Sequence, residues 1–129
     1  MELKFCFDAI FLIDLQKERG SGPAHAFLES HREAQLFWSA ITVGEFAEGF
    51  GSLDDPILAH YLRLVTVLEI NRETALIYSR ITRALRRAGK LIGSNHLWIA
   101  SHAVQYELTL VTADSGRFGR VPRLSFVDY

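Results

Sequence analysis

Three acidic residues stand where buried strands would end. Asp8 and Asp114 come directly after short apolar runs rich in β-formers, LKFCF and TLVTA. Glu45 lies one turn into the helix expected after a third run, LFWSA. Clustered carboxylates repel one another unless a hard cation neutralises them, and their oxygen atoms suit Mg²⁺ or Mn²⁺. Such an ion activates water and stabilises charge on a phosphoryl group, so these residues favour phosphodiester hydrolysis.

Each of these carboxylates also has a purely structural interpretation. Asp8 could cap the helix that follows it, and Asp114, in an Asp-Ser-Gly segment, could form a turn. Thr42 and Glu45 fit the S/T-x-x-E capping box, which requires no chemistry. Only the position that they share at strand ends favours the catalytic interpretation.

Apolar strand-like segments alternate with helical patterns along the chain. We expect strands at residues 3–7, 36–40, 65–70, 109–113 and 124–129. One helix should open at Thr42, a long one should run from an N-cap at Asn71 to about Ala88, and another, 95–106, should be capped by Ser94 or Asn95. The alternation predicts an α/β domain with three layers, α/β/α, around a mostly parallel sheet. Ligands of such sheets bind beyond the carboxyl ends of the strands.

Length and composition predict a single globular domain over residues 1–129. Apolar residues make up 49% of the chain and charged residues 22%. The formal net charge of −1 gives no field over the whole molecule that would attract a polyanion, so any contact with nucleic acid must be local. Cys6 is the only cysteine, and no apolar stretch is long enough for a signal peptide or a membrane span. We therefore expect a cytoplasmic protein that does not bind membranes.

Three segments resemble the motifs of PIN domains. The segment FDAIFLIDL is similar to the family's opening LDTNVLIDL, and SAITVGEFAEG is similar to its second motif around Ser/Thr-x-x-Glu. The run AGKLIGSNHLWIASHAVQYELTLVTADSGRFGRVPRL resembles the VapC-type signature G-x-x-I-G-x-N-D … LVT-x-D … F-x-R-V-P. These matches span nearly the whole chain, in the family's order and spacing. The sequence therefore resembles the VapC-type toxins within the PIN-domain family.

This resemblance implies an endoribonuclease of a toxin–antitoxin pair. Such an enzyme would depend on Mg²⁺ or Mn²⁺, form a homodimer and be held inactive by an antitoxin protein. Carried over by position, the catalytic residues would be Asp8, Glu45, His96 and Asp114. Of these, Asp8, His96 and Asp114 would bind the metal, and Glu45 would be a ligand or a base that orients water. The alternative is a catalytically degenerate PIN module that binds RNA or an antitoxin-like protein without cleavage.

The chain departs from the family's pattern at two places in this site. His96 stands where the family has an aspartate, and Ala9 and Ile10 stand where Thr and Asn usually follow the first Asp. As a ligand, His96 would shift the metal preference, because neutral imidazole suits Mn²⁺ better than Mg²⁺. It could instead be an acid, a base or a phosphate contact, or the site could have decayed. Because Ile10 cannot orient water or hold a carboxylate, we expect metal binding to be weakened by about 10–100-fold.

Basic residues gather in the helix expected at 71–88. Arg80, Arg83 and Arg87 share one face at helical spacing. They could form a track for RNA phosphates leading to the site, or a solvated face with cations favoured near the end of the helix. In the next helix, we expect His102 to be a core histidine and Trp98 to pack in the core or at a dimer contact.

Overall fold

A five-stranded sheet forms the middle layer of the protein, whose computed structural model describes residues 3–129. Its strands are β1 (Lys4–Phe7), β2 (Gln35–Ser39), β3 (Thr66–Leu68), β4 (Thr109–Val111) and β5 (Ser125–Val127). They lie in the order β3-β2-β1-β4-β5, and every pair of neighbours in this part of the chain is parallel. All five strands therefore bring their carboxyl ends to one edge of the sheet.

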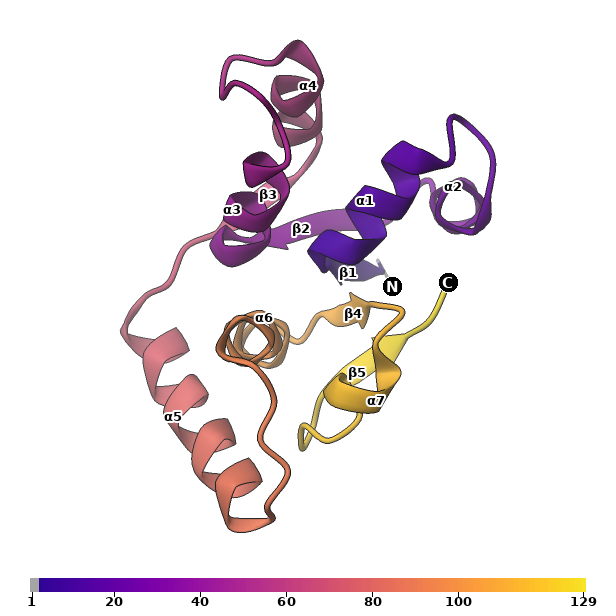
Figure 1. Ribbon diagram of the computed structural model, residues 1–129. Coiled ribbons are helices and arrows are strands. Elements are labelled where there is room, and N and C mark those ends of the chain that lie inside the picture. Colours follow the sequence, from indigo (N-terminus) through magenta and orange to yellow (C-terminus); the bar gives the residue numbers. More distant parts are fainter. Residues whose placement is uncertain (1–2) are drawn as a thin grey trace.

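Helices cover both faces of the sheet (Figure 1). They are α1 (Ala9–Lys17), α2 (Pro23–Ser30), α3 (Ala40–Glu48), α4 (Pro56–Leu64), α5 (Arg72–Arg87), α6 (Ser94–Gln105) and α7 (Ser115–Phe118). In the view of Figure 1, α1 and α2 lie above the sheet, and α5 and α6 lie below it. The predicted α/β/α fold is confirmed. No helix of residues 3–129 has both the length and the apolar character that a membrane span requires.

The side chains of β1 alternate between two separate cores. Phe5 and Phe7 pack with side chains of α1 to α4, whereas Cys6 packs with side chains of α5, α6 and the segment around α7. A sheet covered on both faces needs strands that are apolar throughout, which is why LKFCF carries no alternation. Burial raises the pKa of the Cys6 thiol to about 12, so this residue acts as a small core hydrophobe.

The predicted start of α3 is wrong. Ser39 caps this helix, since its hydroxyl oxygen accepts a hydrogen bond from the backbone N–H of Ile41 at 3.1 Å. The buried hydroxyl of Thr42 donates instead to the carbonyl oxygen of Phe7 at 3.2 Å, which ties α3 to the end of β1. The proposed capping box therefore does not form, and the Glu45 side chain does not serve the start of its own helix.

Helices α5 and α6 pack against each other. Asn71 caps α5 as predicted, and its side-chain oxygen also accepts a hydrogen bond from the Gln105 amide at 3.2 Å. The Thr74 hydroxyl bonds to Gln105 as well, at 2.6 Å. The start of α5 thus lies beside the end of α6. Gly89, with φ 67°, follows the end of α5.

His102 is a core histidine with both ring nitrogens bonded, as predicted. It is fully buried; Nε2 lies 3.0 Å from the carbonyl oxygen of Glu69 and Nδ1 lies 2.9 Å from Ser39 Oγ. Because a carbonyl only accepts, we assign the proton to Nε2 and the acceptor role to Nδ1. Burial lowers the pKa of the imidazole, and the hydrogen bond to Glu69 only partly offsets this effect.

The buried His102 should make stability depend on pH. In the unfolded chain this imidazole takes up a proton near its ordinary pKa of 6.5, whereas the folded protein resists protonation until a lower pH. The contribution is therefore complete above pH 6.5 and is lost as the pH falls, with a slope of at most about 1.4 kcal/mol per pH unit. Urea unfolding at about pH 7.5 and 5.5 measures it.

A matched pair of variants isolates this residue. His102→Gln should be less stable at neutral pH by about 1–3 kcal/mol, since buried partners lose hydrogen bonds, but should lose less stability on acidification than the wild type. His60→Gln removes an exposed imidazole and should keep the wild-type pH dependence. An equally steep acid loss in His102→Gln would show that another group is responsible.

Candidate active site

Asp8 joins the end of β1 to the start of α1. Its Oδ1 accepts a hydrogen bond from the backbone N–H of Phe11 at 3.0 Å, so the residue is the N-cap of α1. Its Oδ2 accepts a hydrogen bond from the hydroxyl of Thr112 at 2.5 Å. The side chain is only 4% exposed. Asp8 therefore caps a helix and also lies where a site residue is expected, so the two interpretations of this residue are compatible.

Burial raises the pKa of Asp8, and its neighbours alter that effect in both directions. The hydrogen bonds from Thr112 and Phe11 lower the pKa, because they stabilise the carboxylate. The nearby His96 also lowers it, and the charge of Asp114 raises it. His96 and Asp114 thus lie close enough to Asp8 to act on its charge.

Thr112 connects two of the predicted acidic residues, and the sequence analysis did not single it out. Its hydroxyl donates to Asp8 and accepts a hydrogen bond from the backbone N–H of Asp114 at 2.9 Å. The residue is fully buried directly after β4. A polar residue at the end of an apolar strand, two positions before an aspartate, was the available signal for this role.

Asp114 is the N-cap of the short helix α7, whereas the structural alternative considered for it was a turn. Its Oδ1 accepts a hydrogen bond from the backbone N–H of Arg117 at 3.3 Å. Its Oδ2 lies 3.4 Å from His96 Nε2 and 3.5 Å from Nη1 of Arg117. The buried Phe118 anchors this helix and packs against the His96 ring, with 5.1 Å between the ring centres. Asp114 is thus already paired with two nitrogen-bearing side chains.

Glu45 reaches the site from α3. Its Oε2 accepts a hydrogen bond from the side-chain amide of Asn95 at 3.3 Å. The prediction that Ser94 or Asn95 caps α6 is wrong. Gly93 holds the N-cap position, and no side chain caps this helix. Asn95 therefore lies in the first turn of α6, where its amide holds an exposed carboxylate of another helix beside His96.

A small pocket of about 70 Å³ collects these residues. The polar side chains that line it are Asp8, Glu45, Asn95 and His96, and the apolar ones are Ala9, Ile10, Ile99 and Phe118. Asp114 adjoins the pocket through its contact with His96. Side chains separated by up to about a hundred positions thus come together at the carboxyl edge of the sheet, where its ligands are expected. Ile10 supplies an apolar wall with no polar side-chain atom.

The donor atoms fit a divalent cation in their chemistry, but they are not arranged as a finished cage. Two carboxylates and an imidazole are ligands that Mn²⁺ accepts, and carboxylates suit Mg²⁺. Nevertheless, no three His, Cys, Asp or Glu side chains of residues 3–129 stand as a group that could hold a metal ion. Asp114 is shared by His96 and Arg117. A bound cation would compete with these two partners for the carboxylate, whereas Asp8 is already held in place.

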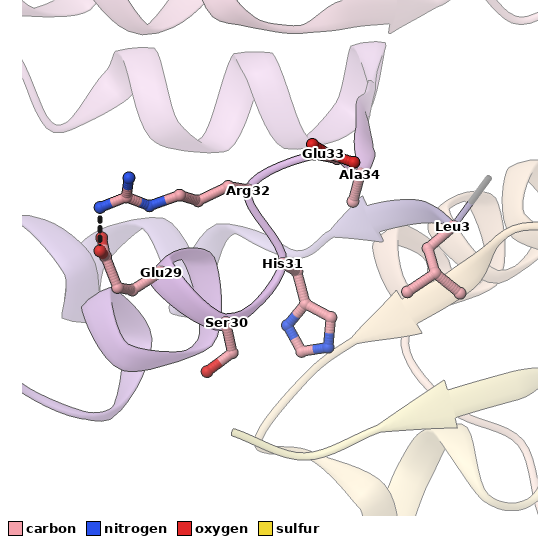
Figure 2. A pocket seen from close by; sticks show the side chains of 7 residues that line it. All are labelled: Leu3, Glu29, Ser30, His31, Arg32, Glu33 and Ala34. Atoms are coloured by element: carbon pink, nitrogen blue, oxygen red, sulfur yellow. Dashed lines mark hydrogen bonds and ion pairs between the residues drawn. The ribbon is translucent and has the colours of Figure 1, made fainter.

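A larger cavity, of about 610 Å³, lies at the opposite end of the strands. It is lined by Leu3, directly before β1, and by residues 29–34, before β2, as Figure 2 shows. The Glu29–Arg32 pair in this view is exposed. His31 stacks on the Phe27 ring, with centres 4.3 Å apart, and donates to the Phe27 carbonyl oxygen at 2.7 Å. Of the two acidic residues that line this cavity, Glu29 and Glu33, Glu29 is paired with Arg32.

A parallel sheet with acidic side chains at its carboxyl edge is the arrangement of a PIN domain. The sequence profile of the PIN domain family matches residues 5–124, and this chain belongs to that family.

Its similarity to named proteins extends over nearly the whole chain. It is 30% identical to Ribonuclease VapC1 of Haemophilus influenzae strain R2866, with 97% of each chain covered. The structure of VapBC-1 from nontypeable Haemophilus influenzae superposes with a TM-score of 0.83 at 28% identity over 98% of each chain. A toxin–antitoxin complex from Klebsiella pneumoniae gives a TM-score of 0.70 at 25% identity, covering 95% of this chain and 94% of that one. The resemblance to VapC-type PIN domains is thus confirmed.

Replacing Thr112 should disturb the site more than the fold. Thr112→Val keeps the shape but removes the hydroxyl between Asp8 and Asp114, and we expect a loss of stability of about 1–3 kcal/mol. Mn²⁺ binding, measured by calorimetry, should weaken by about 10–100-fold, because Asp8 loses the group that orients it. Thr109→Val, at the start of β4, is the matched control and should change the stability and the Mn²⁺ affinity less than Thr112→Val does. Equal Mn²⁺ affinity of the two variants would show that Thr112 does not position the site.

Proposed function

We propose that this protein is a metal-dependent endoribonuclease toxin of the VapC type that hydrolyses RNA phosphodiester bonds. The observation that carries the proposal is the meeting of Asp8, Glu45 and His96 in one pocket, with Asp114 Oδ2 3.4 Å from His96 Nε2. The similarity to Ribonuclease VapC1 over 97% of the chain supports the same reaction.

The residues of the pocket divide the work in this proposal. Asp8, His96 and Asp114 would hold an Mg²⁺ or Mn²⁺ ion, whose positive charge would stabilise the phosphoryl oxygens and lower the pKa of a water molecule. Glu45 is exposed, so its carboxylate is accessible to water and orients the attacking molecule or accepts its proton. Asn95 keeps Glu45 in place through its amide. The walls formed by Ile10, Ile99 and Phe118 limit the access of other water.

In this proposal, the protein works in the cytoplasm as a homodimer, and an antitoxin protein inhibits it. The toxin–antitoxin complex from Klebsiella pneumoniae supports a protein partner of this kind. Large apolar side chains around α4 would gain from such a contact, because Leu53 is 78%, Ile57 52% and Leu64 57% exposed. The single buried Cys6 suits a reducing compartment.

Asp8→Asn tests the activity with little change to the fold. Asparagine is as good an N-cap as aspartate, so α1 keeps its start, while the site loses one negative charge. We expect cleavage of total RNA in the presence of Mn²⁺ to fall by about 100-fold or more, because charge stabilisation worth several kcal/mol is lost. Asp54→Asn, which changes an exposed aspartate outside the site, is the control and should cleave like the wild type.

The same assay tests the alternative of a degenerate PIN module. If neither the wild type nor Asp8→Asn cleaves RNA above a blank, in Mn²⁺ or in Mg²⁺, the nuclease proposal fails. Cleavage that persists unchanged in Asp8→Asn would point to a contaminating nuclease and would fail it equally.

His96 should set the preference between metals. Its imidazole favours Mn²⁺ over Mg²⁺, so we expect Mn²⁺ to bind more tightly than Mg²⁺ in the wild type. His96→Asp restores the oxygen ligand of the family and should reduce this preference by roughly ten-fold, measured as the ratio of the two dissociation constants in calorimetry. His60→Asp carries the same change at an exposed position and should leave the ratio unaltered. An unchanged ratio in His96→Asp would exclude His96 as a ligand.

A further inference from the structure

Helix α5 presents a group of arginines that the rest of the protein does not neutralise. Arg80, Arg83, Arg86 and Arg87 are all exposed. None of the four forms an ion pair with any side chain of residues 3–129. The chain as a whole has a formal charge of −1, so this concentration of positive charge is local. Like charges on one helix repel one another, which costs stability unless a partner supplies the anions.

The arginine face of α5 contains a shallow groove. A cavity of about 420 Å³ is lined by Leu76, Ser79, Arg80, Arg83, Ala84 and Arg87. Its lining contains no carboxylate. Guanidinium groups bind phosphate oxygens with two parallel hydrogen bonds, so three of them along one groove suit a chain of phosphates.

The arginine face lies on the helix that directly precedes α6 in the chain, and α6 carries residues of the pocket. Arg87 is the last residue of α5, and residues 88–93 pass from it directly to the start of α6. His96 and Asn95 of the pocket lie in that first turn of α6. The connection is fixed to the segment after α7, because Arg120 donates to the carbonyl oxygen of Leu91 at 3.4 Å. Exposed Lys90 adds a further positive charge in the connection between α5 and α6.

We propose that Arg80, Arg83 and Arg87 bind the phosphate backbone of single-stranded RNA on its way to the acidic pocket. That the polyanion is RNA rests on the proposed function. The pocket itself, at about 70 Å³, has room for the reacting phosphate and not for its neighbouring nucleotides, so affinity for a longer strand must come from outside the pocket. Contacts with phosphates alone are independent of sequence and depend strongly on salt.

The experiment measures binding without cleavage. The anisotropy of a fluorescein-labelled single-stranded RNA of about 20 nucleotides is titrated with Asp8→Asn protein in EDTA at several salt concentrations. Adding Arg83→Gln and Arg87→Gln removes two phosphate contacts. We expect affinity at low salt to fall by about ten-fold or more, and the slope of log K against log salt to lose about 1.4, or 0.7 for each contact with a single strand.

A matched control removes the same charge elsewhere. Lys17→Gln with Arg63→Gln neutralises two exposed cations near the ends of α1 and α4, and should leave both affinity and slope near those of the Asp8→Asn parent. Circular dichroism checks that all variants fold. If the arginine variant matches the control in affinity and slope, the proposal is overturned. It is also overturned if the groove binds a labelled poly-glutamate peptide in preference to RNA, since that would indicate an acidic protein partner.

The outcomes separate this proposal from the nuclease function. Weaker RNA binding in the arginine variant, together with no cleavage by the wild type, would retain the RNA surface and reject the ribonuclease. Cleavage that depends on Asp8, together with normal RNA binding by the arginine variant, would retain the ribonuclease and reject this surface.

Discussion

The hydrogen bond from Thr112 to Asp8 is the contact on which the site depends. It joins the ends of two neighbouring parallel strands, β1 and β4, through residues 104 positions apart. A carboxylate buried as deeply as Asp8 is costly without such a donor, because burial disfavours its charged form. The same hydroxyl accepts from the backbone of Asp114, so one buried threonine sets the relative positions of two acidic residues.

The two aspartates of the site are also caps of helices, and these roles support each other. Asp8 begins α1 and Asp114 begins α7, each through an oxygen that accepts a backbone N–H. For Asp8, the backbone N–H of Phe11 at the start of α1 lowers the pKa of the carboxyl group, so the cap favours its charged form. Capping and catalysis are therefore not competing explanations for these residues. Glu45 differs, because Ser39 caps its helix and the Glu45 carboxylate instead accepts a hydrogen bond from the Asn95 amide.

The histidine at position 96 changes the electrostatic character of this site. Where the family pattern has a further acid, this chain has an imidazole whose Nε2 faces Asp114. Arg117 approaches the same carboxylate oxygen. Some of the repulsion that a cluster of carboxylates would feel is thus relieved by the protein's own side chains. The folded state therefore depends less on a bound cation than it would with a further carboxylate at this position. The site also offers a cation fewer free carboxylate oxygen atoms.

The sequence by itself determined the layers of the fold, the strand-end aspartates and the core position of His102, because apolar periodicity and the order of elements are local properties. It did not determine which groups those residues bond. The cap of α3 moved to Ser39 because the Thr42 hydroxyl is taken by the Phe7 carbonyl. The same applies to the role of Thr112 and to the pairing of Asn95 with Glu45. Each of these outcomes depends on a partner that is 35 to 104 positions away, and only tertiary packing brings such groups within bonding distance.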